Sequence, residues 1–431
     1  RRCSAPSPVP AIAAPKRRFP EFRNGPGWET RPLGSMVSIT SDKVGDADCV
    51  PMSITSGVGL VSQKEKFGRV IAGDSYRNYL LLRKYDFAYN KSATKQFPEG
   101  FIALYLGDAP AAVPNSIFTC FRLEDDSTLP EYLNLLFLGN LHGQWLRKFI
   151  EVGARAHGSL SVNDKDLLAT PVPLPRGPSS RDEQRRIAEC LSSLDELIGA
   201  ESQKLDALKA HKQGLMQQLF PREGETLPRL RFLEFRDAPD WEAMSIGDFG
   251  DVVTGSTPAT AKPEFYGGGV PFVSPVDIGE LRFVIGTKTT LTELGFSQTR
   301  PIRANSTTFV CIGSTIGKVA QVVSDCATNQ QINSVVPSPN HDDAFVYYML
   351  LHNAERVANL AGKQAVPIVN KTLFSSVQVL APMRKEQERI ASCLSSIDDL
   401  IVAESHKVEN LKTHKQGLMQ QLFPAIEPVG A

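Results

Sequence analysis

Residues 181–221 read RDEQRRIAECLSSLDELIGAESQKLDALKAHKQGLMQQLFP, and residues 384–424 read RKEQERIASCLSSIDDLIVAESHKVENLKTHKQGLMQQLFP. The two segments are identical at 30 of 41 positions, at a constant offset of 203. Leucine, isoleucine and valine recur along both segments with alternating spacings of four and three residues, the pattern of a helix that buries one stripe against a partner helix. We therefore predict two long, matching helices that form a coiled coil, with packing of each stripe on its own domain as the alternative.

The polar residues within each apolar stripe predict how the two helices pair. The first stripe contains Glu201 and Lys212, and the second contains their counterparts Glu404 and Lys415. A parallel in-register pair would set glutamate against glutamate and lysine against lysine, which is repulsive. An antiparallel pair can place Glu201 opposite Lys415 and, in the same register, the second glutamate opposite the first lysine, so we predict antiparallel pairing. The interface residues expected from this register are Ile198, Glu201, Leu205, Leu208, Lys212, Leu215, Ile401, Glu404, Val408, Leu411, Lys415 and Leu418.

A shorter repeat precedes each half of the chain. Nine residues of the segment 15–29, among them Arg18 and Trp28, recur in the segment 228–242 at an offset of 213. The chain is therefore two copies of one unit, each with this lead-in motif, a body and a long helix, although the two bodies hardly resemble each other. The expected boundaries are a disordered tail at 1–14, a first body at 15–175, a helix at 176–221, a linker with the second lead-in motif at 222–240, a second body at 241–383, a second helix at 384–424 and a C-terminal tail at 425–431.

The composition is that of a soluble globular protein with two domains in 431 residues. Its 47 basic and 47 acidic residues balance to zero, which excludes a uniformly basic chain. The charges are nevertheless segregated, because residues 63–95 hold eight Lys/Arg against three Asp/Glu and residues 281–318 hold five against one. The seven cysteines form no C-x-x-C pair, so we expect neither a disulfide framework nor a zinc site, and a cytoplasmic location. No apolar run approaches the roughly 20 residues of a membrane helix.

Candidate contact residues lie in the polar loops of both bodies. Cations, amides and hydroxyls can bind phosphates or the edges of bases. The same groups equally form solvated surfaces or satisfy the backbone of turns. The candidate contact residues are Asn90, Lys91, Ser92 and Arg155 in the first body, and Ser314, Thr315, Lys318, Gln330, Lys363 and Gln364 in the second.

The sequence contains no catalytic or metal-binding motif. The patterns G-x-S-x-G and H-E-x-x-H are absent from it, as is the tetrapeptide of adenine methyltransferases. Residues 313–318, GSTIGK, look like a phosphate-binding loop, but their glycines are one residue too close for G-x-x-x-x-G-K-[ST]. We therefore expect a binding protein without catalytic residues.

With these features the chain resembles the specificity subunit of Type I restriction–modification systems over about residues 15–424. The resemblance rests on the duplicated R-x-E-Q-x-R-I-A helix start and K-Q-G-L-M-Q-Q-L-F-P helix end, on Trp28 and Trp241, and on the sequence TGSTP at 254–258. It implies an α+β fold with two mixed α/β target recognition domains. A pair of long helices would separate these domains and form an antiparallel coiled coil with a pseudo-twofold internal repeat.

The same resemblance implies a non-catalytic DNA-binding protein. Each target recognition domain would read one half of a bipartite, asymmetric site in double-stranded DNA, and the coiled coil would dock two methylation subunits. S-adenosylmethionine would be bound by the methylation subunits, and ATP with magnesium by restriction subunits, with no cofactor or metal on this chain. The alternatives are a coiled-coil scaffold with two ligand-binding heads that does not act on DNA, and a stand-alone DNA-binding regulator.

Overall fold

The computed structural model describes residues 11–12, 14–55, 59–71, 73–95, 97–150, 160–362 and 367–424. The chain divides into two compact units, unit 1 with Arg1–Ile198 and Asn410–Ala431, and unit 2 with Gly199–Glu409. The division crosses both long helices, so each unit contains one body, the first part of the helix that follows it and the last part of the other helix. We call residues 11–175 body 1 and residues 227–383 body 2.

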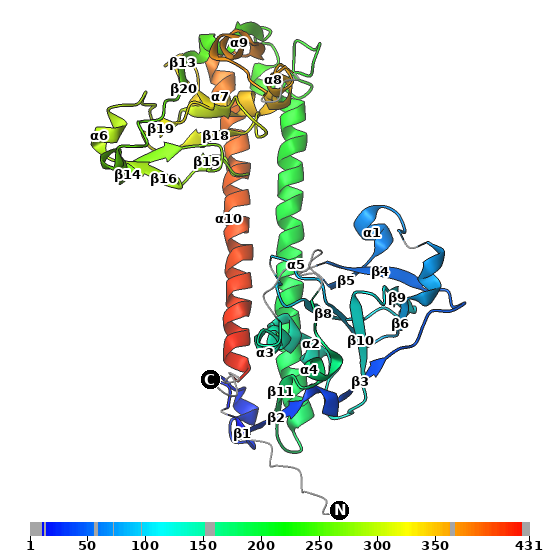
Figure 1. Cartoon of the computed structure of the whole chain (residues 1–431). Helices are drawn as coiled ribbons and strands as arrows, with labels where there is room; N and C mark the ends of the chain where they lie inside the picture. Colours follow the sequence, from blue (N-terminus) through cyan, green and yellow to red (C-terminus); the bar gives the residue numbers. More distant parts are fainter. Residues whose placement is uncertain are drawn as a thin grey trace, which may run out of the picture. The chain divides into compact units, whose positions relative to one another are not determined.

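The two long helices are α5 (Ser180–Leu219) and α10 (Arg384–Leu422), with 40 and 39 residues. They run antiparallel, as the sequence predicted (Figure 1). The side chains of the predicted interface are all buried or half-buried. Each helix ends directly before a Phe-Pro pair, because proline cannot continue an α-helix. In the described part of the chain, no helix is both long enough and apolar enough to cross a membrane.

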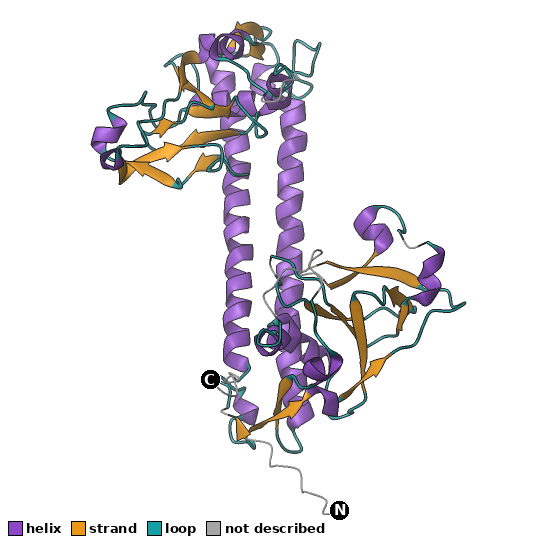
Figure 2. Cartoon of the chain, viewed as in Figure 1, coloured by secondary structure: helices purple, strands orange, loops and turns teal. Residues whose placement is uncertain are grey.

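The described residues of body 1 form three β-sheets, with strand orders β1-β2-β11, β3-β10-β7-β8 and β5-β4-β9-β6 (Figure 2). Its strands are β1 (Ala11–Ile12), β2 (Trp28–Pro32), β3 (Val37–Thr40), β4 (Val50–Thr55), β5 (Gly59–Ser62), β6 (Leu80–Leu82), β7 (Asp86–Asn90), β8 (Phe101–Leu104), β9 (Ala111–Val113), β10 (Phe118–Leu123) and β11 (Pro171–Pro175). Its helices are α1 (Gln63–Phe67), α2 (Pro130–Leu138), α3 (Leu141–Leu146) and α4 (Asp164–Leu168), with 3-10 turns η1 (Pro20–Phe22), η2 (Leu33–Ser35) and η3 (Asp74–Asn78).

The core of body 1 lies between the sheet β3-β10-β7-β8 and α2. Phe87 and Phe121 on the neighbouring strands β7 and β10 stack with ring centroids 5.1 Å apart. Phe137 of α2 meets Phe87 edge-on at 5.7 Å. Ile187 and Leu191 of α5 belong to the same buried cluster, so the first turns of the long helix are part of the body's own core.

The described residues of body 2 also form three sheets, with orders β12-β21, β13-β20-β17-β18-β15 and β16-β14-β19. Its strands are β12 (Glu242–Ser245), β13 (Gly250–Thr254), β14 (Tyr266–Val273), β15 (Phe283–Val284), β16 (Thr289–Leu291), β17 (Thr307–Val310), β18 (Val319–Val322), β19 (Ala327–Thr328), β20 (Ile332–Pro337) and β21 (Gln378–Ala381). Its helices are α6 (Glu293–Phe296), α7 (Asp343–His352), α8 (Ala354–Ala358) and α9 (Lys371–Ser376), with 3-10 turns η4 (Leu233–Phe235), η5 (Ile246–Phe249) and η6 (Pro263–Phe265).

The two bodies share an order of elements that their sequences do not reveal. The sheet order β3-β10-β7-β8 of body 1 corresponds to β13-β20-β17-β18 of body 2. The helix that follows begins at Pro130 in one body and at Asp343 in the other, which is the offset of 213 seen in the lead-in motifs. Each body then closes with a strand, β11 or β21, that pairs antiparallel with the strand at the end of the lead-in motif. The α+β prediction with two mixed domains is confirmed.

Candidate nucleic-acid interface and helix seam

An arginine–glutamate pair joins each lead-in motif to the long helix that follows its body. Arg18 donates from Nε and Nη2 to the two carboxylate oxygens of Glu183 at 2.6 Å. Its counterpart Arg231 makes the same two-bond contact with Glu386 at 2.8 Å. Both glutamates are buried, and a buried carboxylate needs such a partner. The glutamate of the duplicated R-x-E-Q sequence therefore fixes each body to the start of its helix.

The glutamine that follows each of these glutamates holds a helix of the body. Gln184 Oε1 accepts a hydrogen bond at 2.9 Å from the backbone N–H of Leu129, the residue before α2. Gln387 Oε1 accepts one at 3.2 Å from the backbone N–H of Asp342, the residue before α7. The Glu-Gln dipeptide of each repeat thus connects the lead-in motif, a helix of the body and the long helix.

The lysines of the seam pair with aspartates, which corrects the predicted register. Lys415 Nζ lies 2.6 and 2.7 Å from the carboxylate oxygens of Asp195. Lys212 Nζ lies 2.6 Å from Asp398 Oδ1. The predicted pairing of Lys415 with Glu201, and of Lys212 with the second glutamate, was wrong. It weighed only the charges inside the apolar stripe, whereas the aspartates that meet these lysines lie beside the stripe.

The glutamates of the seam pair with two other lysines. Lys407 Nζ lies 2.5 Å from Glu201 Oε1. Lys204 Nζ lies 2.5 Å from Glu404 Oε2. The offset of 203 relates both glutamates and both lysines, so the same cross-helix contact is made twice. The Lys407 ammonium lowers the pKa of the Glu201 carboxyl below its ordinary value.

In unit 2 a buried polar cluster extends from the seam into body 2. Asp398 Oδ2 accepts a hydrogen bond at 2.6 Å from the hydroxyl of Tyr348 in α7, while its Oδ1 is bound by Lys212. Arg282 donates from Nη1 to Ser395 Oγ in α10 at 2.6 Å. Burial raises the pKa of Tyr348 well above its ordinary value, so its hydroxyl keeps the proton that it donates. We call these five residues the Asp398 cluster.

The counterpart of this aspartate in unit 1 makes a simpler contact. Asp195 binds Lys415 through both carboxylate oxygens, and its side chain is 49% exposed, against 12% for Asp398. The residue at the offset of 213 from Tyr348 is Leu135, which has no hydroxyl to donate. No sequence pattern indicated the Asp398 cluster, because both helices contain the aspartate and only body 2 supplies the tyrosine and the arginine. The tyrosine pair within the otherwise apolar α7 is the signal that could have indicated it.

The candidate residues of body 1 lie where β7 ends. Asn90 Oδ1 accepts a hydrogen bond from the backbone N–H of Ser92 at 2.9 Å, which closes the turn. The backbone of Lys91 donates to Ile117 O and accepts from Leu160 N, so this turn is held between two other segments. Asn90, Lys91 and Ser92 are half-buried. Arg155 lies outside the described residues.

The candidate residues of body 2 come together on adjoining loops. Ser314, Thr315 and Lys318 share one turn, and Gln330 lies in a second turn between β19 and β20. The two are neighbours, because the N–H of Cys311, just before the first turn, donates to the carbonyl of Gln331, in the second, at 2.8 Å. The remaining candidates, Lys363 and Gln364, lie outside the described residues.

Two of these side chains already have partners in body 2. Lys318 Nζ donates to Ile278 O at 2.8 Å. The hydroxyl of Thr257 donates to Gln330 Oε1 at 2.5 Å, which leaves the Gln330 NH2 group as the donor that faces outward. Ser314 and Gln330 are exposed. The loops therefore present a hydroxyl and an amide to the surface, while Lys318 is tethered.

The sequence TGSTP lies against the second of these turns because its glycine has no side chain. A Cβ on Gly255 would lie 2.2 Å from Asn329 O and 2.3 Å from Thr328 O. The backbone of Gly255 donates to Ile332 O, and that of Ser256 donates to Thr328 O. This close approach brings Thr257 within reach of the amide-rich turn, so the motif shapes the surface that carries Gln330.

The described residues offer no metal centre, and several of their thiols are buried. No group of three or more His, Cys, Asp or Glu side chains among them is arranged to hold a metal ion. Burial raises the pKa of the thiols of Cys120, Cys311 and Cys326 to about 12. Thiols with so high a pKa stay protonated and are poor nucleophiles.

Comparisons with known proteins point to one family. The model of the Type I restriction modification DNA specificity domain matches residues 239–413. The putative Type I restriction enzyme MjaX specificity subunit of Methanocaldococcus jannaschii is 24% identical over 328 residues, which is 75% of this chain and 74% of that protein. The Type I restriction enzyme HindI specificity subunit of Haemophilus influenzae is 31% identical over 150 residues, 34% of this chain and 32% of that protein.

Solved structures share the fold at low sequence identity. The S subunit of a Type I restriction–modification system from M. genitalium superposes with a TM-score of 0.58 at 14% identity, over 96% of this chain and 100% of that chain. A chain from a structure that describes complex assembly and conformational transition of the Type I system superposes with a TM-score of 0.56 at 18% identity, over 93% of this chain and 98% of that chain.

Proposed function

The chain belongs to the family of Type I restriction–modification specificity subunits, and from that premise we propose that body 1 and body 2 each recognise one half of a bipartite, asymmetric DNA sequence. Specificity subunits are the non-catalytic subunits of Type I restriction enzymes, carry no cofactor themselves and recognise the DNA target. One observation carries the proposal: two bodies with the same strand order but unlike loops are joined to near-identical helices by the same Arg–Glu contact. Like folds with unlike surfaces fit unlike half-sites.

The contacts to DNA in body 2 are proposed for the adjoining turns that hold Ser314, Thr315, Lys318 and Gln330, together with Lys363 and Gln364. The exposed hydroxyl of Ser314 and the outward amide donor of Gln330 are groups that bind base edges. Within the basic stretch 281–318, the exposed Lys288 supports phosphate contacts by the same body. In body 1 the proposed contacts are Asn90, Lys91, Ser92 and Arg155.

The long helices are proposed to dock two methylation subunits, one on each repeat. Two copies of one partner need two equivalent surfaces, and the helix ends supply them. The exposed residues that both repeats share there are His211, Gln213, Gln217 and Gln218, with His414, Gln416, Gln420 and Gln421. The methylation subunits would supply S-adenosylmethionine, and restriction subunits would supply ATP hydrolysis with magnesium.

Methylation mapping tests the division of labour between the bodies. A host that expresses the chain with the methylation subunits of its system should acquire a methylated motif with two specific halves and an unspecific spacer. Gln330→Ala should relax one position in one half, at a cost of about 1–3 kcal/mol, and Asn90→Ala should affect only the other half. A motif that does not depend on this chain, or substitutions in one body that alter both halves, would contradict the proposal.

The docking proposal has a separate test. Gln217→Glu and Gln420→Glu should each remove one of two methylation subunits from the purified complex, as measured by its mass in solution. Gln203→Glu is the matched control, because this exposed residue lies on the same helix but differs from its counterpart His406. Retention of two subunits by both repeat variants would contradict docking on these surfaces.

A coiled-coil scaffold that does not act on DNA is the other candidate function. The Asp398 cluster favours this function, because it joins the helix pair to body 2 through buried side chains. A gel shift of random duplex separates the two candidates, because a DNA-binding subunit retards the duplex and loses that effect as salt is raised. A scaffold leaves the duplex free at every salt concentration.

A further inference from the structure

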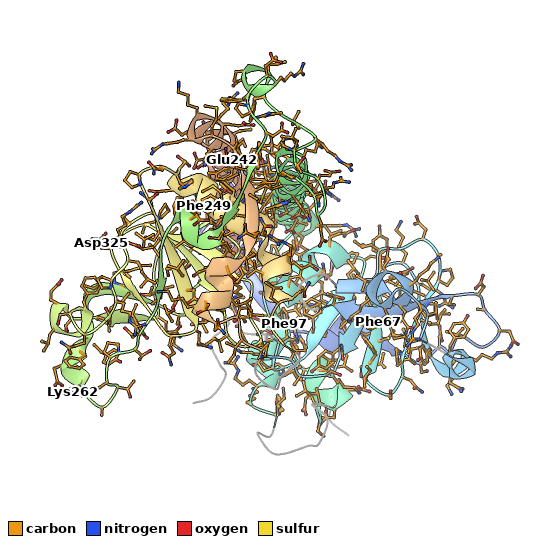
Figure 3. All side chains as sticks on the ribbon, turned by 90° about the horizontal axis from the view of Figure 1, so that it is seen from above. Phe67, Phe97, Glu242, Phe249, Lys262 and Asp325 are labelled. Atoms are coloured by element: carbon orange, nitrogen blue, oxygen red, sulfur yellow. The ribbon has the colours of Figure 1, made fainter. Side chains whose placement is uncertain are left out.

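Body 1 carries three exposed apolar side chains where α1 ends. Helix α1 is labelled in Figure 1. The side chains of Phe67, Val70 and Ile71 are 46%, 50% and 56% exposed. Single exposed apolar residues are ordinary on protein surfaces, but three within five positions of one turn form a patch that calls for a partner. We call these three residues the wedge; Phe67 is labelled in Figure 3.

The backbone beneath the wedge is fixed at several points. α1 begins with a capping box and ends at Gly68, whose φ of 69° lies in the left-handed region that glycine tolerates. The N–H of Ile71 donates to Gln63 Oε1 at 2.9 Å, which closes the turn onto the buried start of the helix. Lys66 Nζ donates to Ile54 O of the neighbouring β4. The wedge is therefore presented on a defined turn.

Besides Lys66, which lies over the Phe67 ring at 5.4 Å, two further cations are close to the wedge in the sequence. Lys64 and Arg69 are exposed and make no ion pair with any described residue. The carboxylate between them, Glu65, accepts a hydrogen bond from Ser62 Oγ at 2.8 Å and caps α1. Elsewhere in body 1 the exposed Arg77 is paired with an aspartate at 2.8 Å. The wedge is thus accompanied in the sequence by two exposed cations, Lys64 and Arg69, that form no ion pair with a described residue.

We propose that the wedge inserts at a base step of duplex DNA, with Phe67 against the unstacked bases and Lys64 and Arg69 on the neighbouring phosphates. Apolar side chains that enter a base step partly unstack it and kink the duplex, and cations beside them gain from the adjacent phosphates. The proposal rests on the proposed function, because it adds a deforming contact to a body that reads bases. An acidic protein surface would also pair with these two cations, and the experiment below distinguishes such a protein partner from DNA.

The test measures bending of a duplex that carries the motif found by methylation mapping and a fluorescent donor and acceptor at its ends. The complex with the wild-type chain should raise energy transfer between the dyes. Phe67→Ala should abolish most of this rise and weaken binding roughly tenfold, the fold-change expected for one lost base–aromatic contact. Phe67→Trp should restore both. Lys64→Gln and Arg69→Gln should each lower the slope of log affinity against log salt by about one.

A control variant removes exposed apolar surface elsewhere. Leu233 in η4 is 72% exposed, and Leu233→Ala should change neither bending nor affinity. Because Phe67 is exposed, Phe67→Ala should unfold at the wild-type temperature, so a loss of bending is not a loss of folding. Wild-type binding with unchanged bending and affinity in Phe67→Ala would overturn the wedge and leave the proposed function standing. Loss of methylation subunits from Phe67→Ala with unchanged bending would assign the patch to protein and overturn it as well. A wild-type chain that binds no duplex would overturn the proposed function itself.

Discussion

Asp398→Ala should destabilise unit 2 by about 3–5 kcal/mol, whereas Asp195→Ala, the same change at the matching position of the other repeat, should cost unit 1 about 0–1 kcal/mol. Removing Asp398 leaves the largely buried ammonium of Lys212 without its partner and the hydroxyl of Tyr348 without its acceptor. Removing one partner of a buried ion pair costs far more than the pair contributes, because the remaining charge stays out of water. The two lysines are similarly buried, at 16% and 13% exposed, but Asp195 is half-exposed, so water can take the place of its carboxylate beside Lys415.

The assay is urea unfolding of the full chain followed by hydrogen exchange, with peptides of body 1 and body 2 read separately. Asp195→Ala is the control, because the same residue type occupies the matching position of the other repeat and also pairs with a lysine of the opposite helix. Tyr348→Phe separates the two contributions within the cluster. It keeps the ion pair and removes the hydrogen bonds of the hydroxyl, of which the shortest is the one to the Asp398 carboxylate, at a cost of about 1.5–3 kcal/mol.

Equal destabilisation by Asp398→Ala and Asp195→Ala would refute this reasoning. It would mean that the helix pair alone sets the cost and that the link to body 2 through Tyr348 contributes nothing. Faster exchange in body 1 than in body 2 after Asp398→Ala would refute it too, because the cluster belongs entirely to unit 2.

Three further predictions concern pH and packing. Burial lowers the pKa of His142 to about 4, below the roughly 6.5 of an unfolded histidine. The unfolded state therefore binds more protons, and body 1 should lose stability as pH falls from about 6.5 to 4. Across that range the unfolding temperature of His142→Gln should depend less on pH than that of the wild-type chain. The pKa of Glu201 is lowered from 4.5, chiefly by Lys407. The stability that Glu201 contributes to the seam is therefore present above pH 4.5 and is lost as pH falls further. Circular dichroism should show this loss in the wild-type chain and not in Glu201→Gln. Gly255→Ala should destabilise body 2 by about 1–3 kcal/mol, because its Cβ would meet Asn329 O at 2.2 Å; an unchanged unfolding temperature would contradict the close approach.

Much of the helix pair could be predicted from the sequence. The 4-3 spacing requires a partner helix, and like charges at matching positions of the two repeats exclude the parallel arrangement. The register could not be obtained in the same way. Asp195 and Asp398 lie beside the stripe, and only the packed helices show that a flexible lysine reaches them in preference to the glutamates.

For the candidate contact residues too, the sequence predicted where they lie and the fold decided which partners they have. In body 2 the candidates were expected in polar loops, and the fold brings the turns that hold Ser314 and Gln330 together through the pairing of Cys311 with Gln331. No local pattern indicated that Lys318 is bound to Ile278 O, because the two residues are 40 positions apart. The wedge was not predicted either. An apolar residue in a sequence is expected in a core, and only the fold shows that Phe67 is exposed.

The sequence by itself determined the duplicated plan, the two long helices, their antiparallel pairing and the likeness to specificity subunits, because these depend on periodicity and repetition along the chain. Tertiary structure alone decided the register of the seam, the common strand order of two unlike bodies, and the different attachment of equivalent aspartates. These features depend on contacts between residues far apart in the chain, such as Tyr348 with Asp398, where the energy of a charge is set by burial and by partners that the repeat does not contain.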